Sequence, residues 1–490
     1  MDLNNTTIKE ARKLLDDKKL TSLELTNFFL KRISDLDENF KTCISVFSDS
    51  AREDAKEADK RIAQGEKGDL LGIPYLVKDI ILTKGKKTTA ASKMLENYVA
   101  PYNATVIKKL NQAGAILLGK TNLDEFAHGA STENSAFFVT KNPWDTTRVP
   151  GGSSGGSSAA VAADLCMFAL GSDTGGSIRQ PASFCGVTGL KPSYGRVSRF
   201  GLMAMTSSTD VIGPLTKNIE DAAIVLKVIA GEDKFDLTSS QNIVEDYLKN
   251  IEKPIKGLKI GIVKEFLEAG LEEGVSSGVL EAVEVFKKLG AEIIDISLPY
   301  NKYSIPVYYI ITPSELSANL ARLDGIRYGY SLKFNPKGQS VENINEIYSK
   351  NRGESFGPEA KRRIMLGTYV LSAGYYDAYY KKAMAVKEKI KQEFKNVFNQ
   401  VDLIITPTSP HTAFKIGQQV NDPLKMYLED IFVTGPSLAG LPAVSIPAGF
   451  SKGLPFGLQI IANKFEENKI FQAGFNYQKE TDWHKKFPNI

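Results

Sequence analysis

Two loops rich in glycine and serine constrain the fold of this chain more than any other feature, because only one helix and one strand separate them. The loops cover residues 150–158 and 171–179, and residues 157–163 have the small side chains of a tightly packed helix. Residues 165–170 then form an apolar run of the length of a buried strand. If this strand lies beneath the helix, the second loop returns beside the first. Both loops then lie at the carboxyl end of the strand, where open α/β sheets place their ligands.

The second loop has the composition of a site that stabilises a negatively charged oxygen. Glycines allow several backbone N–H groups to point at one position, which can stabilise an oxyanion while a serine attacks a carbonyl. Four consecutive residues can supply these donors and the attacking hydroxyl: Thr174, Gly175, Gly176 and Ser177. A serine nucleophile also needs a base, and none of the three histidines of the chain lies near either loop in sequence.

A lysine at the end of an earlier strand is the other candidate for this base. Residues 71–77 have the pattern of a short apolar strand, with Lys78 at its carboxyl end and therefore at the expected edge of the sheet. Asp79 follows and points to the opposite face, so it need not pair with this lysine. A free lysine has a pKa of about 10.4, and service as a base near pH 7 requires burial that favours the neutral amine.

These segments together resemble the three parts of the amidase signature family: Lys78, residues 151–157 and residues 175–179. The resemblance implies that Ser177 is the acyl-forming nucleophile, Ser153 the bridging serine that relays the proton, and Lys78 the base. It also implies a cis peptide between Gly152 and Ser153, and an oxyanion hole made by the backbone N–H groups of residues 174–177. Ser154 is expected to support the loop rather than to react.

Further segments resemble one branch of the family, the A subunits of glutamyl-tRNA(Gln) amidotransferases. They include residues 122–126, 131–137, 142–145 and 189–198, and similar segments continue to residue 442. The branch implies a glutaminase, in which the serine attacks the side-chain amide of glutamine and ammonia leaves. The alternative is a stand-alone amidase that acts on other small amides. A binding scaffold with an inactive site is a third class, against which the intact triad argues.

The second half of the chain is expected to recognise the substrate. Glutamine carries an α-carboxylate and an α-ammonium, so its site needs an arginine for the first and an acid for the second. The resemblance implies that Arg363, Asp430 and Tyr308 make these contacts. On sequence alone, Arg362 and Tyr309 are near-equal choices for the arginine and the tyrosine.

The resemblance also makes expectations about partners and cofactors. No metal or cofactor is expected in this chain. The B subunit of such a complex would bind the charged tRNA, receive the ammonia and use ATP and Mg2+, and a small C subunit would join the two in a heterotrimer. The product would be the amidated form of Glu-tRNA(Gln), with Asp-tRNA(Asn) as a second candidate substrate. Residues 375–398 combine tyrosines with six lysines, but interspersed glutamates favour a solvated helix face over a tRNA contact.

Other interpretations of the loops meet specific objections. A flexible Gly/Ser linker is not normally placed between a Trp-Pro turn and an apolar helix–strand unit. The nucleophile elbow of α/β-hydrolases must follow a strand, whereas residues 141–150 are polar and rich in turn formers. A phosphate-binding loop would need lysine where Ser157 stands. We expect His128 to lie in a pocket wall, and His411 occupies a position where the branch usually has a hydroxyl residue.

Composition narrows the class of protein. The 490 residues carry a net charge of +4, too small by itself to indicate a nucleic acid or a membrane as partner. The three cysteines, Cys43, Cys166 and Cys185, have no metal or disulfide spacing, which is typical of a reducing compartment. No apolar run approaches the roughly 20 residues that span a bilayer. The first residues lack the pattern of a secretion signal, and we expect a cytoplasmic location.

The expected architecture is a single amidase domain over residues 1–490, of the α/β class. A central mixed sheet would carry helices on both faces, with N-terminal helices in residues 1–65, the signature core in 70–215 and a substrate-side half in 255–475. Helices are predicted at 49–64, 103–111, 220–230 and 281–289, and an N-terminal helix pair at 6–35 with a cap at residues 21–22. Further strands are predicted at 115–119, 257–263 and 292–296.

Overall fold

A single mixed sheet runs through both halves of the chain in the computed structural model, which describes residues 3–267, 270–331 and 343–490. Within these residues, eleven strands pair in the order β1-β3-β2-β4-β6-β5-β10-β11-β9-β7-β8. The strands are β1 (Cys43–Val46), β2 (Pro74–Lys78), β3 (Ile116–Thr121), β4 (Phe168–Asp173), β5 (Thr188–Lys191), β6 (Val211–Thr216), β7 (Lys259–Val263), β8 (Glu292–Ile296), β9 (Leu403–Pro407), β10 (Ala443–Ser451) and β11 (Leu454–Ala462). β2 is parallel to β3 and β4, whereas β10 is antiparallel to β5 and β11.

Helices cover both faces of this sheet, as the sequence predicts. The helices of the first half are α1 (Ile8–Asp16), α2 (Ser22–Phe40), α3 (Ser48–Ala63), α4 (Thr105–Gln112), α5 (Gly155–Ala162), α6 (Arg179–Cys185) and α7 (Ile219–Ile229), with short 3-10 turns η1 (Lys93–Leu95) and η2 (Glu125–Ala127). Consecutive residues of β11 show the two faces, because consecutive side chains of a strand point in opposite directions. Phe456 meets Gly278 of α9 (Glu273–Lys288), whereas Gly457 faces Ser183 of α6.

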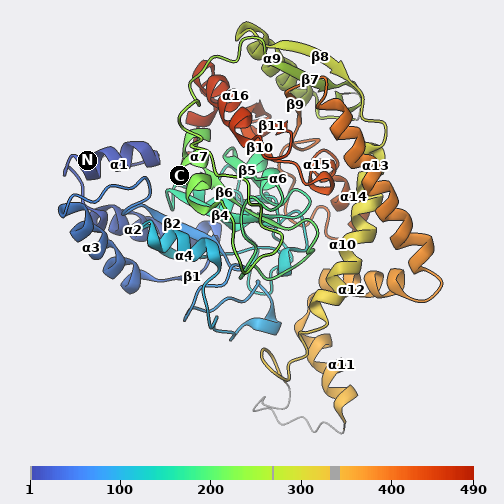
Figure 1. Cartoon of the computed structure of the whole chain (residues 1–490). Coiled ribbons are helices and arrows are strands. Elements are labelled where there is room, and N and C mark those ends of the chain that lie inside the picture. The colour runs from blue at the N-terminus through green and yellow to red at the C-terminus, as the bar shows by residue number, and fades with distance from the viewer. Residues whose placement is uncertain (1–2, 268–269, 332–342) are drawn as a thin grey trace.

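The second half adds the remaining helices. These are α8 (Lys264–Leu267), α10 (Ser304–Leu320), α11 (Ile344–Ser355), α12 (Pro358–Leu371), α13 (Lys382–Val397), α14 (Pro423–Leu428), α15 (Thr434–Ala439) and α16 (Glu467–Glu480), with η3 (Asn301–Tyr303), η5 (Tyr376–Lys381) and η6 (Trp483–Lys485). In Figure 1, α1 to α3 lie at one side of the molecule and α10 to α13 at the other. The helix α10 packs against α12, α13 and α15, so residues from each of these helices can reach a common site.

Most element predictions are confirmed, and the exceptions have structural reasons. The predicted cap is present: Thr21 and Glu24 form a capping box at the start of α2. The β7–α9–β8 unit extends the same sheet, as predicted, with β7 and β8 parallel. The strand predicted at 165–170 begins instead at Phe168 and continues to Asp173, because Ser172 and Asp173 pair with β6. The helix predicted at 281–289 begins earlier, at Glu273.

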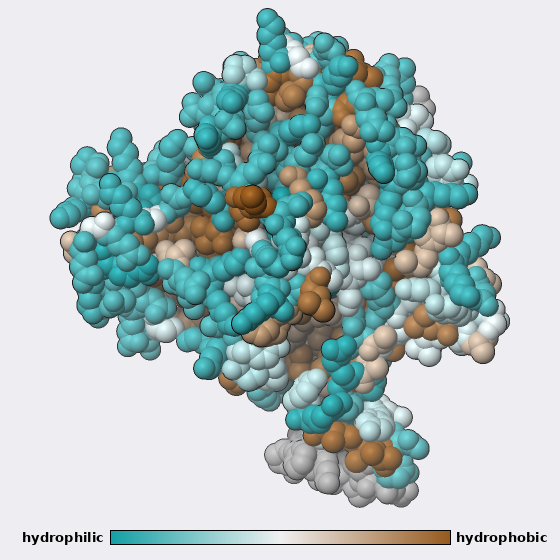
Figure 2. All heavy atoms as spheres, in the orientation of Figure 1, coloured by the Kyte–Doolittle hydropathy of each residue, from teal (hydrophilic) through white to brown (hydrophobic). Residues whose placement is uncertain are grey.

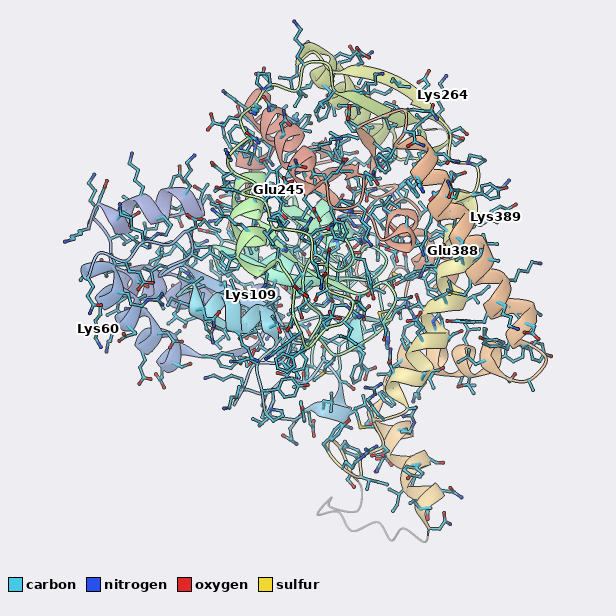
Figure 3. The ribbon with its side chains drawn as sticks, in the orientation of Figure 1. Lys60, Lys109, Glu245, Lys264, Glu388 and Lys389 are labelled. Atoms are coloured by element: carbon cyan, nitrogen blue, oxygen red, sulfur yellow. The ribbon has the colours of Figure 1, made fainter. Side chains whose placement is uncertain are left out.

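Residues 375–398 are not one continuous α-helix, because a π-helical segment, η5, precedes α13. Two of the six lysines of this stretch pair with nearby acids, with Lys381 2.7 Å from Asp377 and Lys391 2.6 Å from Glu388. Figure 3 shows Glu388 and Lys389 together on α13, and Figure 2 shows a mainly hydrophilic surface over this helix. Both observations agree with the solvated face that the sequence favours. No helix in the described residues has both the length and the apolar composition that crossing a membrane requires.

Candidate active site

The sheet brings Lys78 and the two Gly/Ser loops to one edge. The strands β2 and β4 are parallel neighbours, with Tyr75 opposite Phe168 and Val77 opposite Leu170. Lys78 ends β2, and the second loop begins where β4 ends. The carboxyl ends of the two strands therefore coincide, which confirms the placement expected from their sequence patterns.

Three serine hydroxyls surround the Lys78 amine, which is fully buried. Its Nζ donates to Ser153 Oγ at 2.7 Å and to Ser154 Oγ at 2.9 Å. The third acceptor is Ser172 Oγ, at 3.0 Å. Ser172 was not predicted from the sequence, because it belongs to the part of β4 that lies beyond the predicted strand. Its inward orientation is set by the pairing with β6.

Burial lowers the pKa of Lys78 to about 7, although three carboxylates oppose this shift. These are Asp124, Asp173 and Asp210. Both protonation states of the amine are therefore populated near neutral pH. A neutral amine keeps two N–H donors and gains a lone pair that can accept a proton from a neighbouring hydroxyl.

The first loop has a fixed conformation next to this amine. The peptide between Gly152 and Ser153 is cis, as the family resemblance implies. Gly152 N–H donates to Gln180 Oε1 at 2.9 Å, and a Cβ at Gly152 would collide with Asp124. Ser154 N–H donates to the Ser177 carbonyl at 3.1 Å. The two loops are thus hydrogen-bonded to each other, which holds Ser153 and Ser177 on neighbouring backbone segments.

A buried ion pair shapes the second loop. Asp173 accepts from Arg179 Nε at 3.0 Å and Nη2 at 2.9 Å, and both side chains are fully buried. The same carboxylate accepts from the backbone N–H groups of Gly176 at 2.9 Å and Ile178 at 3.2 Å. Although burial alone would raise the pKa of Asp173, the Arg179 charge holds it below its usual value. This pair was given no role from the sequence. The presence of an acid and an arginine six residues apart within a Gly/Ser-rich loop could have indicated it.

The oxyanion donors are fewer than the sequence predicts. Gly176 N–H points at Asp173 and is not available to a substrate in this conformation. No partner is found within the described residues for the N–H groups of Thr174, Gly175 and Ser177. The structure therefore leaves these three as the candidate donors.

The predicted substrate residues lie around the same loop. A Cβ at Gly175 would lie 2.5 Å from Cζ of Tyr308, so the tyrosine ring packs directly on the loop. A Cβ at Gly176 would lie 3.0 Å from Asp430 Oδ1. No described residue donates a hydrogen bond to the Asp430 carboxylate, although Asp430 is only 8% exposed. Burial, opposed by the Arg363 charge, raises the pKa of Asp430 well above its usual value.

The two arginines left open by the sequence differ in burial. The side chain of Arg363 is 4% exposed and that of Arg362 46% exposed. Arg363 Nε donates to Glu359 at 2.7 Å, while the described residues provide no hydrogen-bond acceptor for its Nη1 and Nη2. Its guanidinium lies 5.2 Å from the ring centroid of Tyr309, which stacks on Tyr427. Tyr308 therefore contacts the loop, and Tyr309 supports the arginine.

A small pocket opens beside this arginine. Its volume is about 100 Å³, and its lining includes Gly129, Ser131, Asn134, Arg363 and Tyr427.

His128 precedes Gly129 and is fully buried, with no partner for either ring nitrogen among the described residues. Burial and the charge of Arg363 hold the pKa of His128 well below its usual value. In the described part of the chain, no group of histidine, cysteine and acidic side chains is placed to hold a metal ion.

Comparison with known proteins places this geometry in context. A model of the amidase family matches residues 24–471. The A subunit of the glutamyl-tRNA(Gln) amidotransferase of Caldanaerobacter subterraneus subsp. tengcongensis is 55% identical over 98% of this chain and 97% of that protein. The crystal structure of the corresponding protein of Thermotoga maritima is 44% identical, with a TM-score of 0.82 over 100% of this chain and 98% of that one. A peptide amidase from Stenotrophomonas maltophilia is 27% identical, with a TM-score of 0.80 over 98% and 97% of the two chains.

Proposed function

The chain belongs to the amidase family, and we propose that it is the glutaminase subunit of a tRNA-dependent amidotransferase. Its relatives of 55% and 54% identity are the A subunits of glutamyl-tRNA(Gln) amidotransferases, matched over nearly their whole length. The observation that carries the substrate assignment is a buried arginine and a buried aspartate without hydrogen-bond partners for their terminal atoms. Arg363 Nη1 and Nη2 and the Asp430 carboxylate have none among the described residues, and both side chains are buried. An amino acid supplies both counter-charges at once.

The proposed reaction transfers a proton through the serine pair to Lys78. The neutral amine accepts the proton of Ser153 Oγ, and Ser153 Oγ accepts that of Ser177. Ser177 Oγ then attacks the side-chain amide carbon, and the N–H groups of Thr174, Gly175 and Ser177 stabilise the oxyanion. The proton returns along the same path to the leaving nitrogen, the C–N bond breaks, and ammonia departs. Water, activated by the same relay, hydrolyses the acyl-enzyme to glutamate and regenerates Ser177.

Arg363 and Asp430 would bind the charged α-carboxylate and α-ammonium of glutamine. Arg363 can bind the α-carboxylate through two parallel N–H donors. The α-ammonium would lie on Asp430, and its positive charge would stabilise the ionised form of that buried carboxylate. Tyr308 lies on Gly175 and would close the site beside the amide.

The remaining components of the reaction belong to partners. We place ATP and Mg2+ in a B subunit that binds Glu-tRNA(Gln), or Asp-tRNA(Asn), and uses the ammonia to amidate it. The C subunit would complete a heterotrimer in the cytoplasm. The glutaminase then needs no cofactor or metal of its own, because the relay uses only amine, hydroxyl and backbone groups.

Ammonia release from glutamine tests this proposal. We would measure it for the isolated chain and for the chain copurified with its partners, with and without Glu-tRNA. Release from glutamine that rises with partners and Glu-tRNA is the expected result. Turnover of a simple uncharged amide, with none of glutamine under any combination, would instead establish a stand-alone amidase, the activity suggested by the likeness to the peptide amidase.

Substitution of the buried arginine separates the same two activities. In Arg363→Lys the positive charge remains but the second parallel hydrogen bond to the carboxylate is lost, at a cost of about 2 kcal/mol. We expect the KM for glutamine to rise about 30-fold, with a smaller change in kcat. The matched control is Arg362→Lys, whose half-exposed side chain should leave KM within about twofold. Equal KM values for the two variants would contradict the assignment of Arg363.

The pH dependence of kcat/KM reports the protonation state of Lys78 in the free enzyme. Only the neutral amine can accept the serine proton, so kcat/KM should be low in acid and rise with pH. Since burial lowers the pKa of Lys78 to about 7, the midpoint of the rise should lie near pH 7. The measurement is kcat/KM for glutamine between pH 5.5 and 9 at constant ionic strength. A profile without a rise in this interval would contradict the role of Lys78 as base.

A further inference from the structure

A histidine lies directly behind the segment that carries Asp430. His411 follows β9 along the chain, and its Nε2 lies 2.9 Å from the carboxylate of Glu429, the residue before Asp430. Its other ring nitrogen, Nδ1, lies 2.9 Å from the Thr412 carbonyl. Glu429 is 2% exposed, and its Oε1 also accepts from Gln419 Nε2 at 2.7 Å.

Both ring nitrogens of His411 therefore face hydrogen-bond acceptors. A carbonyl oxygen and a carboxylate cannot donate, and a neutral imidazole has only one N–H. Both contacts are hydrogen bonds only when the ring is a doubly protonated imidazolium. Consistently, although burial lowers the pKa of His411, the hydrogen bond and charge of Glu429, together with the Thr412 carbonyl and the charge of Glu272, raise that pKa above its usual value.

The surroundings hold the ring in this orientation. His411 stacks on Phe184 and meets Phe414 edge-on, each with a centroid distance of 6.2 Å. The other charged side chains around the ring have partners or line the adjoining open pocket; they are Glu272, Arg148, Lys425 and Lys452. Glu272 accepts from Thr412 at 3.1 Å and pairs with Lys452 at 3.4 Å, and Arg148 pairs with Asp145 at 3.0 Å. Glu429 is thus the one carboxylate bonded to the ring in the described residues.

The position of Glu429 determines that of Asp430, because the two residues are adjacent on one short turn. The helix α15 follows this turn, and its first residue, Thr434, donates from Oγ1 to the Asp430 carbonyl at 2.7 Å. The Asp430 carboxylate lies against Gly176. We propose that protonated His411 is a positioning residue, which holds Glu429 and through it places Asp430 to bind the α-ammonium of the substrate. The inference rests on the proposed function, and His411 itself does not touch the substrate.

The proposal has a definite pH signature. Below its pKa the imidazolium donates to Glu429 and the segment is held. As the pH rises through that pKa, the ring loses one proton and its charge, and the single remaining N–H can serve Glu429 or the Thr412 carbonyl but not both. The ion pair is then lost, so the advantage of the wild type over a variant without the ring must be largest in mild acid and smaller in base.

Three variants in the copurified complex test this signature through KM and kcat for glutamine between pH 6 and 9. For His411→Ala we expect a KM about tenfold above wild type at pH 6, a ratio about threefold smaller at pH 9, and little change in kcat. His411→Gln keeps a donor for Glu429 at every pH and should restore KM at pH 6. His484→Gln, a histidine in η6 outside this network, should match wild type throughout. A KM ratio of His411→Ala to wild type that is independent of pH, or an effect on kcat alone, would overturn the proposal.

A second measurement follows the titration of His411, and so its ion pair with Glu429, in the absence of substrate. The chain has only three histidines, so their 15N-labelled imidazoles can be followed by NMR as the pH is changed. The His411 ring should titrate above the usual range in the wild type and at a lower pH in Glu429→Gln. A ring that is neutral at pH 6 in the wild type would overturn the proposal even if KM changes. A wild type that titrates as expected but releases no ammonia from glutamine would overturn the proposed function, and the positioning role with it.

Discussion

Replacing Ser177 with alanine is expected to abolish ammonia release from glutamine, with kcat falling about 10⁴-fold or more. The substitution removes the only oxygen that forms the acyl-enzyme in the proposed mechanism, while Lys78 and the backbone donors stay in place. Attack by water would remain, assisted only by binding and the oxyanion donors, and such assistance leaves a small residual rate. The measurement is ammonia release at saturating glutamine, with copurified partners present.

A serine from the same helix–loop unit provides the control. Ser158 in α5 is fully buried, and its hydroxyl donates to the Gly155 carbonyl at 3.1 Å. Ser158→Ala should leave the glutaminase rate within about threefold of wild type, because the hydroxyl lies outside the proton relay. Ser177→Ala with more than about 1% of wild-type activity, in preparations free of wild-type enzyme, would remove Ser177 from the role of nucleophile.

Replacing Lys78 with methionine is expected to lower kcat about 10³- to 10⁴-fold and to remove the rise of activity with pH. Methionine is similar in length but has no proton acceptor of useful basicity, so Ser153 Oγ can no longer pass on its proton. The three hydroxyls that Lys78 contacts would also lose a donor, which costs about 1–3 kcal/mol of stability if one of them stays unpaired. Activity should therefore be measured together with thermal unfolding, and expressed per folded molecule.

A second buried lysine separates loss of stability from loss of the base. Lys120 is also fully buried, and its Nζ lies 3.6 Å from Asp79. Lys120→Met leaves that carboxylate without its counter-charge, so it should destabilise the protein by about 3–5 kcal/mol. Its activity per folded molecule, and the midpoint of its pH profile, should nevertheless stay near those of wild type. If both variants lost activity only in proportion to unfolding, Lys78 would have a structural role and not a catalytic one.

Local patterns were sufficient to predict the elements that carry the reactive groups. Apolar runs ended by polar residues marked the strands β2, β3 and β4, and the capping pattern at Thr21 marked the start of α2. The Gly/Ser loops, with Lys78, carried the family resemblance and hence the proposed triad. The predictions of the strands and of the helix cap succeeded because each depends on residues within about ten positions of one another, where periodicity and turn chemistry act directly.

The limits of those patterns are clearest where contacts join distant parts of the chain. Arg362 and Arg363 are adjacent on α12, and their local sequence does not distinguish them. Packing of that helix against α10 buries one and exposes the other. Arg179 donates to Gln459, a partner 280 residues away, so the rigidity of the second loop could not be predicted from the loop itself.

The sequence by itself determined which groups are candidates for the reaction: a lysine at a strand end, two serines and a loop of backbone donors. The tertiary structure alone decided their environment. The pairing of β4 with β6 brought Ser172 to the Lys78 amine, and the turn Asp173–Gly176 removed one predicted oxyanion donor. The physical reason is that hydrophobic periodicity specifies which face of an element is buried but not what lies against it. Three features depend on what lies against each group. They are the pKa of Lys78, the absence of hydrogen-bond partners for the terminal atoms of Arg363 and Asp430 among the described residues, and the contact of His411 with Glu429.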